Sequence, residues 1–119
     1  MSTSADPPAG AGMAVEYRAA QRYRILQRCH VRPPGVTGRD GWRSIAYSIS
    51  ATGIGVTLPL PVVPGTEIDV EPWQLPGAGP LRATVVHASR LEFVWLCGCR
   101  LAAPLAEPEL TAWLATATI

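Results

Sequence analysis

Prolines and glycines divide this chain into short pieces, and this feature limits its possible folds more than any other. The 119 residues include 12 prolines and 11 glycines, which are spread along the chain rather than gathered in one tract. A proline inside a helix removes a hydrogen bond and breaks the helix, so this spacing disfavours a bundle of long helices. Many short elements joined by turns are instead typical of an all-β domain.

Alternation of apolar and polar residues predicts where the strands lie. Successive side chains of a strand point to opposite faces, so a half-buried strand alternates in this way. The segment that begins at Tyr23 shows the pattern with an interruption at Leu26 and Gln27, and residues 89–92 have the composition of a hairpin turn. The expected strands are residues 23–31, 42–50, 54–58, 66–71, 81–88 and 93–101.

Residues 107–114 break this pattern and predict one short helix. Acidic residues and a proline stand in the first turn, and Leu110, Trp113 and Leu114 have the spacing of a single helix face. Six short antiparallel strands without a repeating unit bury their apolar faces best by curling into a small barrel. We therefore predict an all-β fold: a six-stranded antiparallel split β-barrel with a short C-terminal helix that covers one end or one face.

The same alternation assigns side chains to the inside or the outside of the barrel. In the second expected strand, Ile45, Tyr47 and Ile49 share the face that we expect to be buried, and small or polar residues share the other. In the fifth, His87 is aligned with apolar residues. We expect it to be a semi-buried histidine rather than a catalytic base.

The three cysteines are expected to be reduced thiols. The chain shows no secretory signal and no apolar run of the roughly 20 residues that a bilayer requires, so we expect a cytoplasmic protein without membrane insertion. Cys97 and Cys99 are in line with Phe93 and Trp95 on an apolar strand face, where free cysteine packs as a small hydrophobe. We expect no metal site, no cofactor and, because no catalytic arrangement stands out, no enzymatic activity.

The composition is that of a globular protein, with 48% apolar and 16% charged residues. The first residues are small, polar or proline and lack strand or helix periodicity. We expect residues 1–14 to form a flexible tail and residues 15–119 to form one domain.

Positive charge is concentrated in the first third of the chain. The net charge is only +1, but residues 18–43 contain seven arginines and a single acid, Asp40, and the chain contains no lysine. Such a local excess attracts anions. Guanidinium groups bind phosphate oxygens in a bidentate manner and stack on flat rings. The arginines are Arg18, Arg22, Arg24, Arg28, Arg32, Arg39 and Arg43.

Two short motifs follow one another in the order and at the spacing of a known family. Arg18 and Arg22 form R-x-x-x-R just before the first expected strand, and Ser48, Ser50 and Gly53 form S-x-S-x-x-G at the end of the second. Over residues 16–115 the chain resembles the PilZ domain family, which carries R-x-x-x-R followed by [D/N]-x-S-x-x-G. Neither motif is specific alone, and the combination carries the resemblance.

The resemblance implies a receptor for cyclic di-GMP, a bacterial second messenger often bound as a stacked dimer. Arg18 and Arg22 would then hold phosphates and guanine faces, Ser48 and Ser50 would read guanine edges, and Gly53 would allow a tight turn. Ser48 departs from the family, which has Asp or Asn there. A neutral hydroxyl in place of a carboxylate predicts weakened binding rather than none. The signal would pass to a partner protein of unknown identity.

Other interpretations remain open from the sequence. Arg24 and Arg28 form a second R-x-x-x-R, although they lie inside the strand on its solvent side. Ser48 also favours a degenerate PilZ barrel that binds no nucleotide and acts only as a protein-interaction module. A third possibility is a barrel that binds single-stranded nucleic acid through its arginine-rich strand, but we do not expect a nucleic acid polymer as partner.

Overall fold

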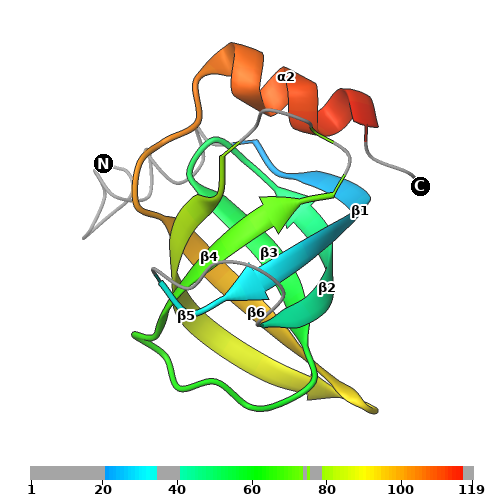
Figure 1. Cartoon of the computed structure of the whole chain (residues 1–119), viewed down its shortest axis with the longest axis vertical. Helices are drawn as coiled ribbons and strands as arrows, with labels where there is room; N and C mark the ends of the chain where they lie inside the picture. The colour runs from blue at the N-terminus through cyan, green and yellow to red at the C-terminus, as the bar shows by residue number, and fades with distance from the viewer. Residues whose placement is uncertain (1–20, 35–40, 74, 76–78, 117–119) are drawn as a thin grey trace, which may run out of the picture.

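A computed structural model of the chain describes residues 21–34, 41–73, 75 and 79–116, and it confirms the predicted barrel. Six strands pair with antiparallel neighbours in the closed order β1-β2-β3-β6-β5-β4, and one helix lies across an end of the barrel (Figure 1). The predicted tail, residues 1–14, lies outside the described residues, as does Arg18. The elements are β1 (Tyr23–Arg32), β2 (Trp42–Ile49), β3 (Gly53–Leu58), β4 (Glu67–Pro72), β5 (Leu81–Leu91), β6 (Val94–Leu101) and α2 (Glu107–Thr116).

The core fills the inside of the barrel with small and branched apolar side chains. Ile54, Val56 and Leu58 of β3 all point inward, as predicted. Trp113 of α2 is only 3% exposed, so the helix closes the barrel end with its one fully buried aromatic ring. Gln27 ties this helix to β1, because its Nε2 donates to Thr116 Oγ1 at 3.3 Å.

The prediction that the cysteines belong to the core is confirmed. Cys29 and Cys97 are fully buried and Cys99 is nearly so, and all three are free thiols. Burial raises the pKa of Cys29 to about 11 and that of Cys99 to about 12, since a thiolate loses its hydration inside the barrel. These thiols are therefore protonated at neutral pH and unreactive in the folded protein.

The face assignment in β2 was partly wrong because this strand contains a bulge. Its register against β3 shifts between Ala46 and Ser48. Ala46 is fully buried, whereas Ile45 and Tyr47 are partly exposed on the outer surface. A bulge places one extra residue in a strand and so reverses the faces on either side of it. Past the bulge, Ile49 points inward as expected.

A second bulge corrects the expectation for His87. The register of β5 against β6 shifts between Val85 and His87, and His87 is exposed rather than semi-buried. Its imidazole lies against the backbone of Gly98, where a Cβ would meet His87 Nε2 at 2.5 Å. The space that the missing side chain leaves is therefore filled by the ring.

The hairpin that joins β5 to β6 is longer and its turn tighter than predicted. β5 continues to Leu91 and β6 begins at Val94, which leaves Glu92 and Phe93 as the turn. Glu92 has a φ of 55°, and Phe93 is 91% exposed rather than part of the apolar face. Cross-strand pairing thus carries the hairpin beyond the core, to the end of the molecule opposite α2 (Figure 1).

Candidate functional site

A pocket of about 680 Å³ lies where the first half of β1 meets the end of β2. Arg24 of β1 is directly opposite Ser48 of β2 in the antiparallel ladder, so a cation and a hydroxyl stand side by side. We call this cavity the Arg22 pocket. It is lined by Arg22, Tyr23, Arg24, Ile25, Leu26, Tyr47 and Ser48.

Arg22 reaches from the start of β1 to the turn that follows β2. Its Nη2 atom is 3.8 Å from the position that a Cβ would take at Gly53. The side chain is exposed, and among the described residues no carboxylate forms an ion pair with it. The structure thus brings together Arg22 and Gly53, both predicted site residues.

Ser50 and Gly53 build that turn. The backbone N–H of Ser50 donates to the carbonyl of Gly53 at 2.9 Å, and Ser50 Oγ accepts from the N–H groups of Gly53 and Thr52 at 3.0 and 3.2 Å. Ser50 is only 3% exposed. Its oxygen is therefore used by the turn, while its O–H remains able to donate. The role of Ser50 in reading a guanine edge stays a prediction.

Gly53 has a steric reason to lack a side chain. A Cβ at this position would stand 3.0 Å from the carbonyl oxygen of Cys99 on β6, with Arg22 on its other side. Gly53 thus allows β3 to pair closely with β6 while Arg22 lies over the turn.

Ser48 lines the pocket and carries an unsatisfied hydroxyl. Its Oγ is buried and finds no hydrogen-bond partner among the described residues. Most buried polar atoms in native proteins are paired, so this unpaired oxygen is an exception among the described residues. The role of Ser48 in binding a ligand stays a prediction.

Tyr47 belongs to the pocket although the sequence pattern placed it in the core. The bulge turns it outward, and its ring packs across Gly55, where a Cβ would meet Tyr47 Cζ at 2.6 Å and Ser48 Oγ at 2.8 Å. Burial raises the pKa of Tyr47, and the positive charge of Arg22 opposes this rise. The glycine at position 55 was a possible sequence signal, because a strand glycine often marks a bulge or a close approach.

The alternative arginine pair is divided between two places. Arg24 lines the Arg22 pocket, whereas Arg28 lines a different pocket farther along β1. The two arginines of the second R-x-x-x-R motif therefore line separate pockets. Arg24 can supplement Arg22.

Comparison with known proteins supports the fold alone. No family model matches the chain, and no curated protein matches it in sequence. Among solved structures, the inhibitor of motility MotI/DgrA of Bacillus subtilis matches with a TM-score of 0.60 and 15% sequence identity. The match covers 81% of this chain and 47% of the other, so this chain spans about half the length of that protein. The likeness supports a PilZ-like barrel.

Within the described ranges, no helix has the length and apolar character needed to cross a membrane. No group of three or more potential metal ligands was found in the same part of the chain. The cytoplasmic location stays a prediction.

Proposed function

We propose that this protein binds cyclic di-GMP in the Arg22 pocket and passes the signal to a partner protein. One observation carries the proposal: the chain brings Arg22 to the turn at Gly53, beside a pocket whose wall holds the unpaired hydroxyl of Ser48. These residues come from two separate motifs of the sequence. Their meeting is what the PilZ resemblance requires.

The size and chemistry of the pocket suit a nucleotide. Its volume, about 680 Å³, lies within the usual range for small-molecule sites. Arg22 and Arg24 offer guanidinium groups to phosphate oxygens, and the flat ring of Tyr47 offers a surface on which a guanine can stack. We propose that Arg18, which lies outside the described residues, completes the clamp with Arg22.

Serine at position 48 predicts modest affinity. A carboxylate there would accept charge-assisted hydrogen bonds from a guanine edge, whereas a hydroxyl makes a neutral bond. The difference is on the order of 1 kcal/mol, or roughly tenfold or less in affinity. Ser48 is also the observation that favours the second candidate, a PilZ-like barrel that binds no nucleotide and only contacts other proteins.

The proposal assigns no catalysis to this site. Among the described residues that line the Arg22 pocket there is no carboxylate and no histidine to serve as a general base near neutral pH. A receptor needs binding groups alone. We propose that ligand contacts change the surface around β1 and β2 and that a partner protein responds to this change.

Isothermal titration calorimetry with cyclic di-GMP tests the proposal. We expect saturable heats for the unaltered chain and a loss of most affinity for Arg22→Ala, because the variant removes the cation beside the turn. Arg90→Ala is the matched control: Arg90 is also exposed, but it lies near the β5–β6 turn and bonds the carbonyl of Glu92. Heats equal to dilution for the unaltered chain would reject the proposal and favour the second candidate.

A further inference from the structure

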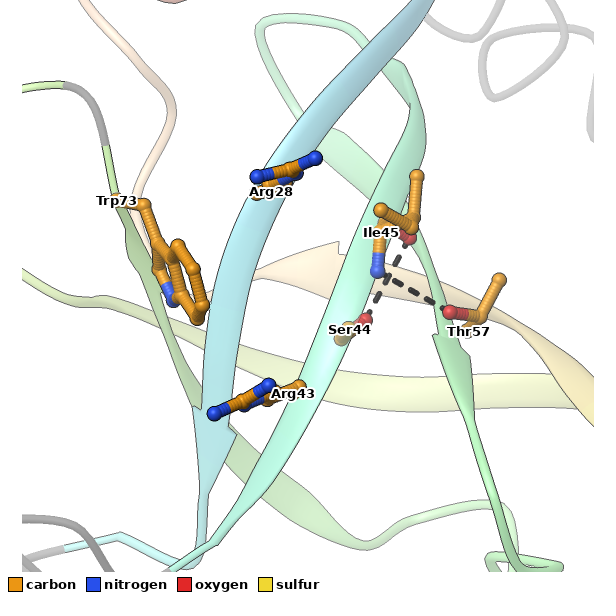
Figure 2. Close-up of a pocket in the computed structure, with 6 residues that line it drawn as sticks. All are labelled: Arg28, Arg43, Ser44, Ile45, Thr57 and Trp73. Carbon is orange, nitrogen blue, oxygen red and sulfur yellow. Dashed lines mark hydrogen bonds between the residues drawn. The ribbon is translucent and has the colours of Figure 1, made fainter.

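A second pocket lies on the outer surface of the barrel, farther along β1 and β2, and it shares no lining residue with the Arg22 pocket. Its volume is about 380 Å³, and it is lined by residues of β1, β2 and β3 and by the residue that follows β4 (Figure 2). We call it the Trp73 pocket. Its lining residues are Arg28, Arg43, Ser44, Ile45, Thr57 and Trp73.

Backbone hydrogen bonds hold this pocket in shape. The N–H of Trp73 donates to the carbonyl of Arg28 at 3.0 Å, which fixes the chain after β4 against β1. Arg28 stands opposite Ile45 in the ladder of β1 and β2. The N–H of Ile45 donates in turn to Thr57 Oγ1 at 3.1 Å (Figure 2). The walls thus come from neighbouring strands and one anchored loop residue.

The pocket combines an exposed indole with two cations. Trp73 is 47% exposed, in contrast to the buried Trp113. The guanidinium of Arg43 lies over the Trp73 ring, 5.8 Å from its centroid, and Arg28 reaches out from the adjacent strand (Figure 2). Such a contact keeps a flat apolar surface and a positive charge together.

Neither arginine is neutralised within the described part of the chain. The ion pairs found there join Arg32 to Glu71 and Arg82 to Asp69, and none involves Arg28 or Arg43. Both side chains are exposed. Tryptophan and arginine are enriched among the residues that dominate binding energy at protein interfaces. The pocket therefore has the composition of an anchor point with a positive charge.

We propose that the Trp73 pocket binds a segment of a partner protein in which an acidic residue adjoins an apolar one. The carboxylate pairs with Arg28 and Arg43, and the apolar side chain packs on Trp73 and Ile45. Charge complementarity determines this choice of occupant, because two unneutralised guanidinium groups flank an apolar wall. The inference is separate from nucleotide binding, which uses the other pocket.

The lining favours a peptide over single-stranded nucleic acid. Sites for single strands stack successive bases on several aromatic side chains along a positive groove. Among the described residues that line the Trp73 pocket, Trp73 is the sole aromatic, and Arg43 already covers one part of it. A peptide carboxylate pairs with guanidinium groups, so its binding does not require a second aromatic ring.

Fluorescence anisotropy with a short labelled peptide tests the proposal. The probe carries Glu and Asp residues on both sides of a Leu-Leu pair, and its matched control has Gln and Asn instead. We expect the acidic probe to bind the full chain with a Kd of about 1 mM or tighter. Arg28→Glu, Arg43→Glu and Trp73→Ala should each weaken binding about tenfold or more. Arg90→Glu should leave it unchanged.

Three results would overturn the proposal. They are equal binding of the acidic and the amide probe, undiminished binding by the Arg28 and Arg43 variants, and no binding of the acidic probe at millimolar protein. Preferential binding of a labelled uridine oligonucleotide, lost in the same variants, would assign the pocket to nucleic acid instead. Arg43 and Trp73 do not line the Arg22 pocket, so variants at these positions should bind cyclic di-GMP as the unaltered chain does. Cyclic di-GMP titrations of these variants therefore distinguish a failure of the peptide proposal from a failure of the nucleotide proposal. Circular dichroism confirms that each variant is folded.

Discussion

The Nη2 atom of Arg22 lies 3.8 Å from the point where a side chain at Gly53 would begin. A residue at the start of the first strand thus covers a turn that follows the second. The turn itself is held by the hydroxyl oxygen of Ser50, which accepts a hydrogen bond from the N–H of Gly53 at 3.0 Å.

Gly53→Ala should weaken the fold. The added methyl would stand 3.0 Å from the carbonyl oxygen of Cys99 on β6, whereas its distance of 3.8 Å from Arg22 Nη2 is an ordinary contact. Overpacking of this kind costs about 1–2 kcal/mol. Urea unfolding measures the loss, with Gly79→Ala as control, because nothing lies within 4 Å of a Cβ at Gly79. Equal urea midpoints for the two variants would show that the turn accommodates a Cβ at position 53, and would contradict the prediction.

Tyr47→Ala should reduce the affinity for cyclic di-GMP, whereas Tyr47→Phe should retain most of it. The ring packs over Gly55 on the pocket side, and stacking of a base on an aromatic ring contributes about 1–3 kcal/mol. Calorimetry of both variants checks this role. If Tyr47→Phe lost as much affinity as Tyr47→Ala, the hydroxyl rather than the ring face would be the contact.

Ser48→Asp should bind cyclic di-GMP more tightly than the unaltered chain. The substitution introduces an acidic residue at a position whose oxygen is buried and unpaired. A charge-assisted bond to a guanine edge should raise the affinity up to about tenfold. Ser48→Ala is the matched control and should bind more weakly. An Asp variant that binds no better than Ser48→Ala would contradict the assigned role.

Stability should fall as the pH rises above 9. The pKa of Cys29 is raised from 9.0 to about 11 and that of Cys99 from 9.0 to about 12 by burial. Below pH 9 these thiols are protonated in both states and contribute no pH dependence. Above pH 9 the unfolded chain ionises first, so unfolding becomes more favourable up to about pH 11–12. Urea midpoints between pH 8 and 11 should fall less in a Cys29→Ala, Cys99→Ala variant. If the urea midpoint fell equally with pH in the variant and in the unaltered chain, groups other than Cys29 and Cys99 would cause the loss of stability.

The fold was largely predictable because most strands alternate regularly. The apolar residues of β3 and Trp113 of α2 are buried in the core, as expected. Burial of one side of a strand or helix produces the regular spacing of apolar residues from which these positions were predicted. The faces of Tyr47 and His87 were mispredicted because a one-residue bulge reverses the alternation. No residue type within β2 or β5 indicates the shift, and Gly55, opposite Ser48 on β3, was the possible signal for Tyr47.

The site was predictable only in outline. The structure places Arg22 near the turn at Gly53, and both Arg22 and Ser48 line the Arg22 pocket, while their role in binding stays a prediction. Tyr47 was missed for the reason just given. The Trp73 pocket was missed because it depends on a backbone bond from Trp73 to Arg28, which joins residues that are distant in the sequence. The pattern of neighbouring residues in the sequence does not indicate such a bond.

Nuclear magnetic resonance titration of the isotope-labelled chain with cyclic di-GMP tests the central claim most directly, because it reports where the ligand binds. The account predicts saturable shifts of backbone amide signals at Arg22, Arg24 and residues 47–53, with those at residues 90–93 of the β5–β6 turn unchanged. Arg22→Ala should abolish most of these shifts at the same ligand concentration. A spectrum without shifts at Arg22 and residues 47–53, at ligand and protein concentrations near 1 mM, would contradict it.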